Sequence, residues 1–132
     1  MNAVSSLLGR AGLSLIFIIS GWGKIAGYAG TQAYMESMGV SGALLPLVIA
    51  LELGGGLAIL SGLFTRSVSL ALAAFSIVSA AIFHADFGDQ MQAISFWKNV
   101  AMAGGFLVLA AHGPGPLSLD ARLRRTGDAR SA

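Results

Sequence analysis

The stretch LLPLVIALELGGGLAILSGLF, residues 44–64, decides the fold of this chain. It is apolar apart from scattered small residues and Glu52, and it is long enough for one membrane-spanning helix, which needs about 20 mostly apolar residues. Three further stretches have the same character, namely residues 5–22, 67–84 and 93–112. Four such stretches in one short chain predict a protein built from membrane-spanning helices.

Composition supports the same class. Hydrophobic residues make up 55% of the 132 residues and charged residues only 11%, against about 25% charged in an ordinary soluble domain. A soluble helical bundle would have too little polar surface to cover four such helices. We therefore predict an all-α membrane protein, an antiparallel bundle of four transmembrane helices with an interfacial segment between the first and the second. The predicted spans are about 5–23, 44–63, 67–84 and 92–111, within one transmembrane domain of residues 1–120 that is followed by a basic cytoplasmic tail, residues 121–132.

The distribution of charge predicts the orientation in the membrane. Basic residues near span ends favour the cytoplasmic side, and Arg66 lies in the short turn between the second and third spans. The loop between the third and fourth spans contains Asp86 and Asp89 and no basic residue. An even number of spans then places both termini in the cytoplasm. Half of the eight basic residues lie in the tail: Arg122, Arg124, Arg125 and Arg130.

Three charged residues lie inside the predicted spans, where a charge costs a few kcal/mol on insertion scales. At about 1.5 Å per helical residue, Lys98 lies roughly 9 Å and Glu52 roughly 12 Å below the predicted outer ends of their spans. Arg10 lies roughly 9 Å from the opposite face. We therefore expect Glu52 to be the hub, with Lys98 as its near-level partner and Arg10 as a deeper second partner.

Two interpretations of this cluster stay open. Two positive charges against one negative charge leave one cation without a protein partner, which favours a pocket for an anionic or carbonyl-bearing molecule. The alternative is an ion-paired lock that only fixes the register of the helices. Asn99 follows Lys98 but points about 100° away on a helix, so we expect these two side chains to face different neighbours.

Helical spacing predicts which faces point inward. In the first span one face is polar or small over much of its length, and it ends at Lys24, which we expect to extend to the outer surface. His84 lies near the outer mouth of the bundle, and its spacing to the following aspartates matches no metal-ligand motif, so no metal is predicted. The first-span face comprises Arg10, Ser14, Phe17, Gly21 and Lys24, and a small-residue face of the third span comprises Ser69, Ala73, Ser76 and Ala80.

Together these pieces resemble the DoxX family of small membrane proteins, and the resemblance covers nearly the whole chain in order. After the Arg10 span, the matching segments are FIISGWGKI (17–25), ELGGGL (52–57), GLFTR (62–66), His84, FWKNV (96–100) with Gly104 and Gly105, and GPGPLSLD (113–120).

The resemblance implies a four-helix protein of the bacterial cytoplasmic membrane. Relatives in the family are tied to quinone-linked redox work, including a thiosulfate:quinone oxidoreductase subunit, and to oxidative stress. A mycobacterial relative is associated with a membrane redox complex. The resemblance carries over recurrent polar positions and no established catalytic residue: Arg10, Lys24, Glu52, His84, Lys98 and Asn99.

The leading functional hypothesis is a membrane subunit that binds a quinone or similar amphiphile and supports its reduction or detoxification. Lys98 or Arg10 would donate to a quinone oxygen, and Glu52 would hold the cation or relay a proton. The chain lacks cysteine and any recognisable flavin, haem or iron–sulfur motif, so electrons would come from a partner. The expected partners are the lipid bilayer, redox proteins and further copies of the chain, and not nucleic acid. The alternatives are a non-enzymatic scaffold for redox partners and a small-solute transporter.

Overall fold

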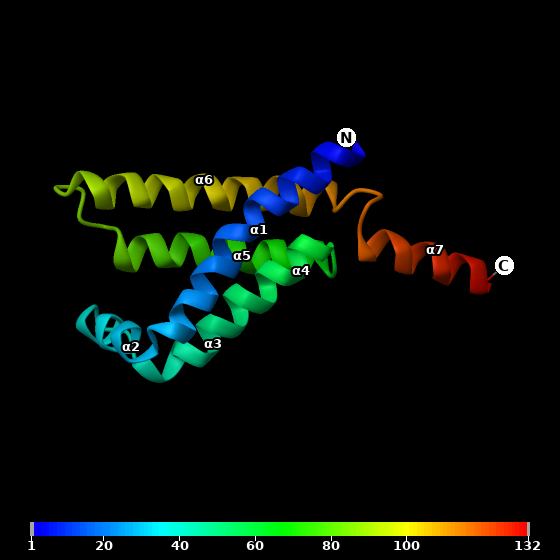
Figure 1. The fold of residues 1–132 in the computed structure, drawn as a ribbon. Helices are drawn as coiled ribbons and strands as arrows, with labels where there is room; N and C mark the ends of the chain where they lie inside the picture. Colours follow the sequence, from blue (N-terminus) through cyan, green and yellow to red (C-terminus); the bar gives the residue numbers. More distant parts are fainter. Residues whose placement is uncertain (1, 132) are drawn as a thin grey trace.

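The computed structural model describes residues 2–131, and over that range every regular element is a helix (Figure 1). Four helical segments are long and apolar enough to cross a membrane: Ala3–Ala26, Gly42–Ser61, Thr65–Phe83 and Gln90–His112. They coincide with the four predicted spans to within a few residues. The predicted all-α, four-span fold is confirmed.

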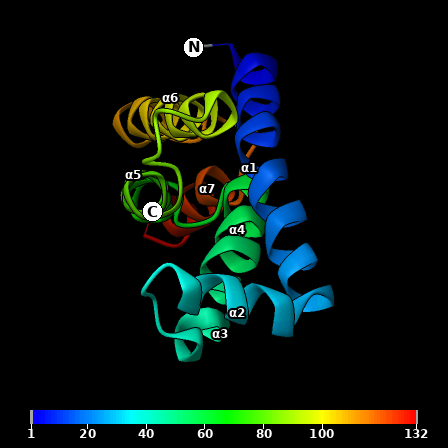
Figure 2. The same cartoon turned by 90° about the vertical axis from the view of Figure 1, so that its left-hand side faces the viewer.

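The four spans run up and down in alternation. The start of α1 (Ala3–Ala26), the end of α4 (Gly55–Ser61) and the end of α6 (Gln90–His112) lie at one end of the bundle (Figure 1). We name it the α7 end, because α7 (Leu119–Ser131) projects from it. The opposite end, named the α2 end, contains α2 (Tyr28–Ser37). Figure 2 shows α1 beside α4, and α6 beside α5, so the bundle consists of two helix pairs.

The second span is a composite helix. It starts with a 3-10 turn (Gly42–Leu44) and continues as α3 (Leu45–Ile49), in which Pro46 occupies the first turn, where its missing N–H is harmless. A π-helical turn, η2 (Ala50–Gly54), then joins α3 to α4. Such a turn contains one residue more than an α-helical turn and occurs frequently at functional sites. Glu52 lies at the centre of it.

Small and aromatic residues form the contacts between the spans. Phe17 packs edge-on against Phe106, with ring centroids 5.5 Å apart, and it also touches Phe75. The predicted inward face of α1 is buried from Arg10 to Gly21. The predicted small-residue face of α5 (Thr65–Phe83) is buried as well, as helices in a membrane pack through small side chains. Its members are Ser69, Ala73, Ser76 and Ala80.

Gly21 sets the distance between α1 and the π turn. A Cβ placed on Gly21 would lie 2.9 Å from the backbone nitrogen of Leu53, closer than real Cβ atoms approach. Gly56, one turn further along the second span, meets the α1 backbone in the same way, with a Cβ site 3.1 Å from the nitrogen of Ile18. These two glycines therefore let the helices approach backbone to backbone.

Replacing Gly21 by alanine is expected to destabilise the bundle by about 1–3 kcal/mol, the usual cost of overpacking. Gly23→Ala is the matched control, because no atom lies within 4 Å of its Cβ site and alanine favours a helix. Unfolding in mixed micelles titrated with a denaturing detergent measures both. Equal stability of the two variants would show that the close approach at Gly21 contributes nothing.

The segment between the first two spans, predicted to be interfacial, contains the helix α2. Tyr34 stacks on Phe83 of α5, with ring centroids 5.5 Å apart, and Gln32 donates to the backbone oxygen of Gly42 at 3.1 Å. Met35 is buried beneath the helix. Helix α2 is therefore fixed across the α2 end of the bundle instead of hanging from it.

The chain after α6 folds back under the start of α5. Asp120 accepts hydrogen bonds from the backbone N–H groups of Phe64 and Thr65, at 2.8 and 2.9 Å. The Asp120 N–H in turn donates to the backbone oxygen of Gly62. These bonds satisfy free donors at the start of α5 and cap it from a distant part of the chain. Phe64 itself has a φ of 48°, an uncommon value outside glycine.

These bonds predict a pH dependence. Burial alone would raise the pKa of Asp120, but the hydrogen bonds from Thr65 and Phe64 and the nearby charge of Arg124 bring that pKa below its ordinary value. A lowered pKa in the folded state adds stability above the ordinary pKa, and this stability is lost as the pH falls through the folded value. Asp120→Asn should therefore cost about 1 kcal/mol at neutral pH and much less in acid. An unchanged difference between wild type and variant across a pH series of unfolding curves would contradict this.

Candidate functional site

An ion pair lies inside the bundle, between α1 and the π turn. The Glu52 side chain is nearly inaccessible, with 4% of its surface exposed, and the Lys24 side chain is 28% exposed. The Lys24 Nζ lies 2.9 Å from each of the two Glu52 oxygens. It is the one ion pair within residues 2–131. Glu52 is thus at the centre of the buried charges, as the sequence predicts, but its partner is Lys24 instead of Lys98.

The local sequence explains this pairing. Phe17, Gly21 and Lys24 follow one another on one face of α1 at helical spacing. Phe17 is anchored in the core and Gly21 touches the backbone of Leu53. One helical turn beyond Gly21, the Lys24 side chain therefore reaches Glu52 directly. The prediction that Lys24 extends to the surface is wrong, because its ammonium group is bound to this carboxylate.

Two cavities meet at the ion pair. The first, about 330 Å³, lies under α2 against α3 and α5, and we name it the α2 cavity. The second, about 310 Å³, lies between α1, α5 and α6, and we name it the α6 cavity. Their walls are mostly apolar, so the polar groups at the junction are the chief source of specificity. Lining residues common to both are Lys24, Glu52, Phe75, Ser79 and His84.

Lys98 and Asn99 both line the α6 cavity. Lys98 is exposed on the surface and forms no ion pair with Glu52. The predicted Glu52–Lys98 pair is therefore wrong. Counting along a helix gives the depth of a residue in the bundle but not its distance from a neighbouring helix, and here the α6 cavity separates Lys98 from Glu52. Asn99 lines the same cavity as Lys98, and that the two side chains face different neighbours stays a prediction.

Arg10 has a separate role at the α7 end. Its side chain is 1% exposed, and it donates to the backbone oxygens of Ile59 and Leu60 at 3.2 and 2.9 Å. It also donates to the backbone oxygen of Leu117. A cation is favourable at these last carbonyls of α4. The predicted Arg10–Glu52 pair is wrong, because Arg10 joins α1, α4 and the returning chain.

The other polar residues at the α2 end have simpler surroundings. His84 is half-buried at the end of α5 and lines both cavities. Asp89 caps the start of α6 by accepting from the N–H of Met91 at 2.9 Å. In the part of the chain that the structure describes, no three His, Asp or Glu side chains group as metal ligands.

The arrangement suits recognition of a polar head on an apolar molecule. An ammonium group has three N–H donors, and two of those of Lys24 are directed at the two Glu52 oxygens. One donor remains for a ligand oxygen. The paired carboxylate holds the ammonium in place, and the apolar walls would hold an apolar ring or tail.

Comparisons with known proteins agree with the fold. The family model DoxX matches residues 5–85, more than half of the chain. The chain is 51% identical over 125 residues to "Inner membrane protein YqjF" of Escherichia coli (strain K12), covering 95% of this chain and 96% of that protein. It is 40% identical to "Inner membrane protein YphA" of the same organism, over 88% of each chain. No solved structure matches. With a family model matching across three of the four spans and a relative of more than 50% identity along almost its full length, this chain belongs to the DoxX family.

Proposed function

We propose that this protein binds the head group of a quinone, or of a similar carbonyl-bearing amphiphile, at the Lys24–Glu52 pair. The observation that carries the proposal is an ion pair with a buried carboxylate and a partly exposed ammonium, placed where two apolar cavities meet. Ionisable residues in a membrane span are costly and typically mark a functional site. A pair that served only to lock helix register would not need cavities on both sides.

The charges around the cavities favour an electron-rich ligand. Arg10 is satisfied by carbonyl groups at the other end of the bundle, so the surplus cation is Lys98 in the wall of the α6 cavity. A quinone oxygen between Lys24 and Lys98 would accept a hydrogen bond from either one. Negative charge that develops on this oxygen during reduction would be stabilised by both.

The size of the cavities and their mostly apolar walls favour a small head with an apolar tail. Volumes of about 330 and 310 Å³ lie at the lower end for ligand pockets, so each suits one ring. Glu52 would relay a proton to the reduced ring through Lys24. Electrons would come from a partner redox protein or a soluble donor.

In this proposal the protein resides in the inner membrane, as the names of its relatives suggest, with both termini and the α7 end in the cytoplasm.

Purification in a mild detergent followed by solvent extraction tests the proposal. Chromatography and mass spectrometry of the extract should recover quinone in an amount comparable to the protein. The Glu52→Gln variant should recover several-fold less, because the ammonium of Lys24 is no longer held in place. Wild type that yields no more quinone than an unrelated four-span protein, purified alongside, would contradict the proposal.

A further inference from the structure

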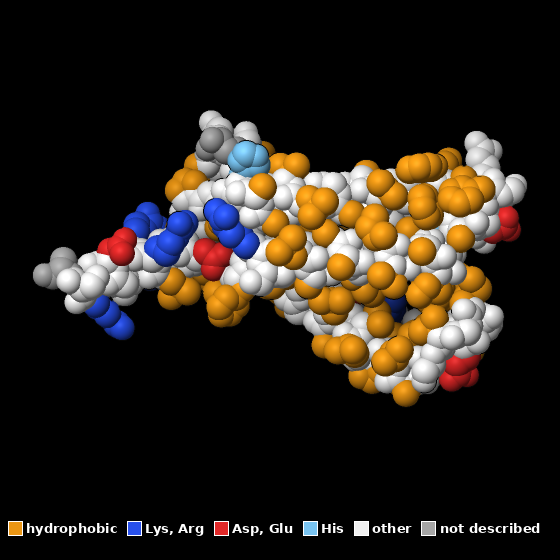
Figure 3. Space-filling view, turned by 180° about the vertical axis from the view of Figure 1, so that it is seen from behind, with side chains coloured by type: hydrophobic (Ala, Val, Ile, Leu, Met, Phe, Trp, Pro, Cys, Tyr) orange, Lys and Arg blue, Asp and Glu red, His pale blue; other side chains and the backbone are white. Residues whose placement is uncertain are grey.

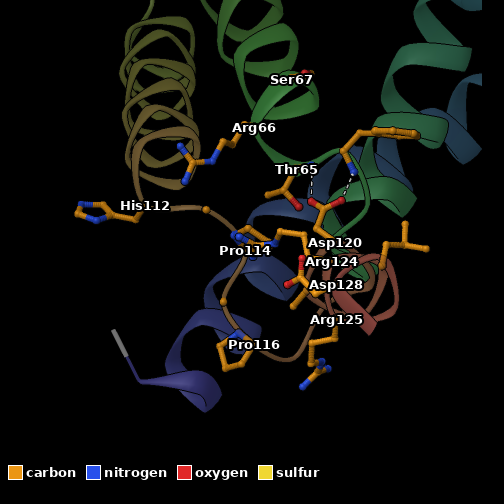
Figure 4. A pocket seen from close by; sticks show the side chains of 15 residues that line it. Thr65, Arg66, Ser67, His112, Pro114, Pro116, Asp120, Arg124, Arg125 and Asp128 are labelled. Carbon is orange, nitrogen blue, oxygen red and sulfur yellow. Dashed lines mark hydrogen bonds between the residues drawn. The ribbon is translucent and has the colours of Figure 1, made fainter. Parts of the chain in front are cut away.

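A third cavity, of about 820 Å³, lies at the α7 end (Figure 4) and shares no lining residue with the two cavities at the ion pair. We name it the α7 cavity. Its walls are the first turn of α5, the returning segment after α6 and one side of α7. Nothing in the proposed function uses it.

Three arginines line the α7 cavity. Arg66 comes from α5, and Arg124 and Arg125 come from α7. None of their guanidinium groups forms a hydrogen bond or an ion pair with another residue of the described range 2–131, although the charge of Arg124 acts on the nearby Asp120 carboxylate. Figure 4 shows Arg66 extending toward the end of α6, where His112 also lines the cavity. The space-filling view in Figure 3 shows basic side chains gathered at the α7 end of a face that is otherwise largely apolar.

Two carboxylates in the same wall offset only part of this charge. Asp120 is occupied by the N–H groups of Phe64 and Thr65, and Asp128 is exposed on α7. Three arginines against two carboxylates leave a net positive charge in the cavity. Guanidinium groups bind phosphate oxygens in pairs of hydrogen bonds and are preferred for phosphate recognition.

The surroundings distinguish a lipid head group from a soluble ion. The cavity lies where the apolar spans end, at the depth of the polar head groups of a bilayer. Phe64, Leu123 and Pro116 contribute apolar walls, which a free phosphate ion does not need but the glycerol and upper acyl chains of a lipid would contact. We propose that the α7 cavity binds the head group of an anionic phospholipid, with Arg66, Arg124 and Arg125 on its phosphate.

Helix α7 provides a matched pair of variants. Arg124→Gln with Arg125→Gln removes two charges from the cavity wall, and Arg122→Gln with Arg130→Gln removes two charges from exposed positions of α7 outside it. The full chain in neutral detergent is mixed with equal amounts of phosphatidylglycerol and phosphatidylcholine, and bound lipid is counted by native mass spectrometry. Wild type should retain phosphatidylglycerol preferentially. The cavity variant should lose roughly tenfold or more of this binding, and the control variant less than twofold.

Several results would overturn the proposal. Wild type without preference for phosphatidylglycerol shows that no anionic head group is recognised. Equal loss in both double variants shows attraction to the net charge of α7 without a site. If millimolar inorganic phosphate displaces phosphatidylglycerol and occupies the cavity to the same extent, the cavity is a site for a soluble ion. Because the quinone site lies at the other end of the bundle, failure here leaves the proposed function standing.

Discussion

Replacing Lys24 by methionine should destabilise the bundle by about 3–5 kcal/mol, the loss typical when one partner of a buried ion pair is removed. Methionine has a similar length, so the main change is the loss of the ammonium group from the Glu52 carboxylate. That carboxylate is 4% exposed and has no other partner among the residues described. Denaturing-detergent titration in mixed micelles, followed by circular dichroism, measures the change.

Substituting the other partner of the pair, and then both partners together, makes the prediction specific. Glu52→Leu should cost less than Lys24→Met, because the Lys24 side chain is 28% exposed and its ammonium can regain contact with water or head groups. Combining Lys24→Met with Glu52→Leu should restore most of the stability, since apolar replacement of a whole buried pair is often neutral. Additive losses in the double variant would show that the two side chains do not interact.

Arg10→Leu is expected to cost at least about 3 kcal/mol, because each hydrogen bond to a charged group contributes about 1.5–3 kcal/mol and three backbone oxygens lose their donor. Ile59 and Leu60 lie in the last turn of α4, and Leu117 lies in the returning segment. Their connection to α1 would be lost. Limited proteolysis should then cut within residues 113–120, and we expect the same treatment to leave this segment uncut in wild type.

Arg130→Leu is the control for Arg10→Leu, because it removes the same type of side chain from an exposed position of α7. It should change stability by less than 0.5 kcal/mol, as surface substitutions usually do. Arg10→Lys should lie between the two, since an ammonium cannot reach all three oxygens in a planar fork. Protection of residues 113–120 in the Arg10→Leu variant would contradict the role of Arg10 as the connection between α1 and this segment.

The sequence was sufficient to predict what depends on hydrophobic runs and helical spacing. The four spans follow from apolar stretches of about 20 residues, and the buried face from Arg10 to Gly21 follows from spacing along one helix. The small-residue face of α5 follows in the same way. In each case the signal lies within a single segment, where the geometry of the backbone is known in advance.

The partners of the charged residues could not be predicted in this way. The level of Glu52 in the bundle follows from helical rise, but the helix it faces depends on how the spans are arranged. The π turn adds one residue to the second span, and one residue turns a helix by about 100°, which no periodicity in the sequence indicates. One signal in the sequence could have indicated the pairing of Lys24 with Glu52. Gly21 lies on the inward face of the first span, one turn before Lys24, and a glycine there permits close approach of another helix.

The central claim, that the Lys24–Glu52 pair is a binding site, is tested most directly by titrating a short-chain quinone into wild type and into the Lys24→Met/Glu52→Leu double variant. Ligand that binds only the folded state stabilises it by about 2.7 kcal/mol at a concentration a hundredfold above Kd. Wild type should show a stabilisation of this size, and the folded double variant should show none. Equal stabilisation of both proteins would place quinone elsewhere, and no stabilisation of wild type would leave the ion pair as a lock between helices.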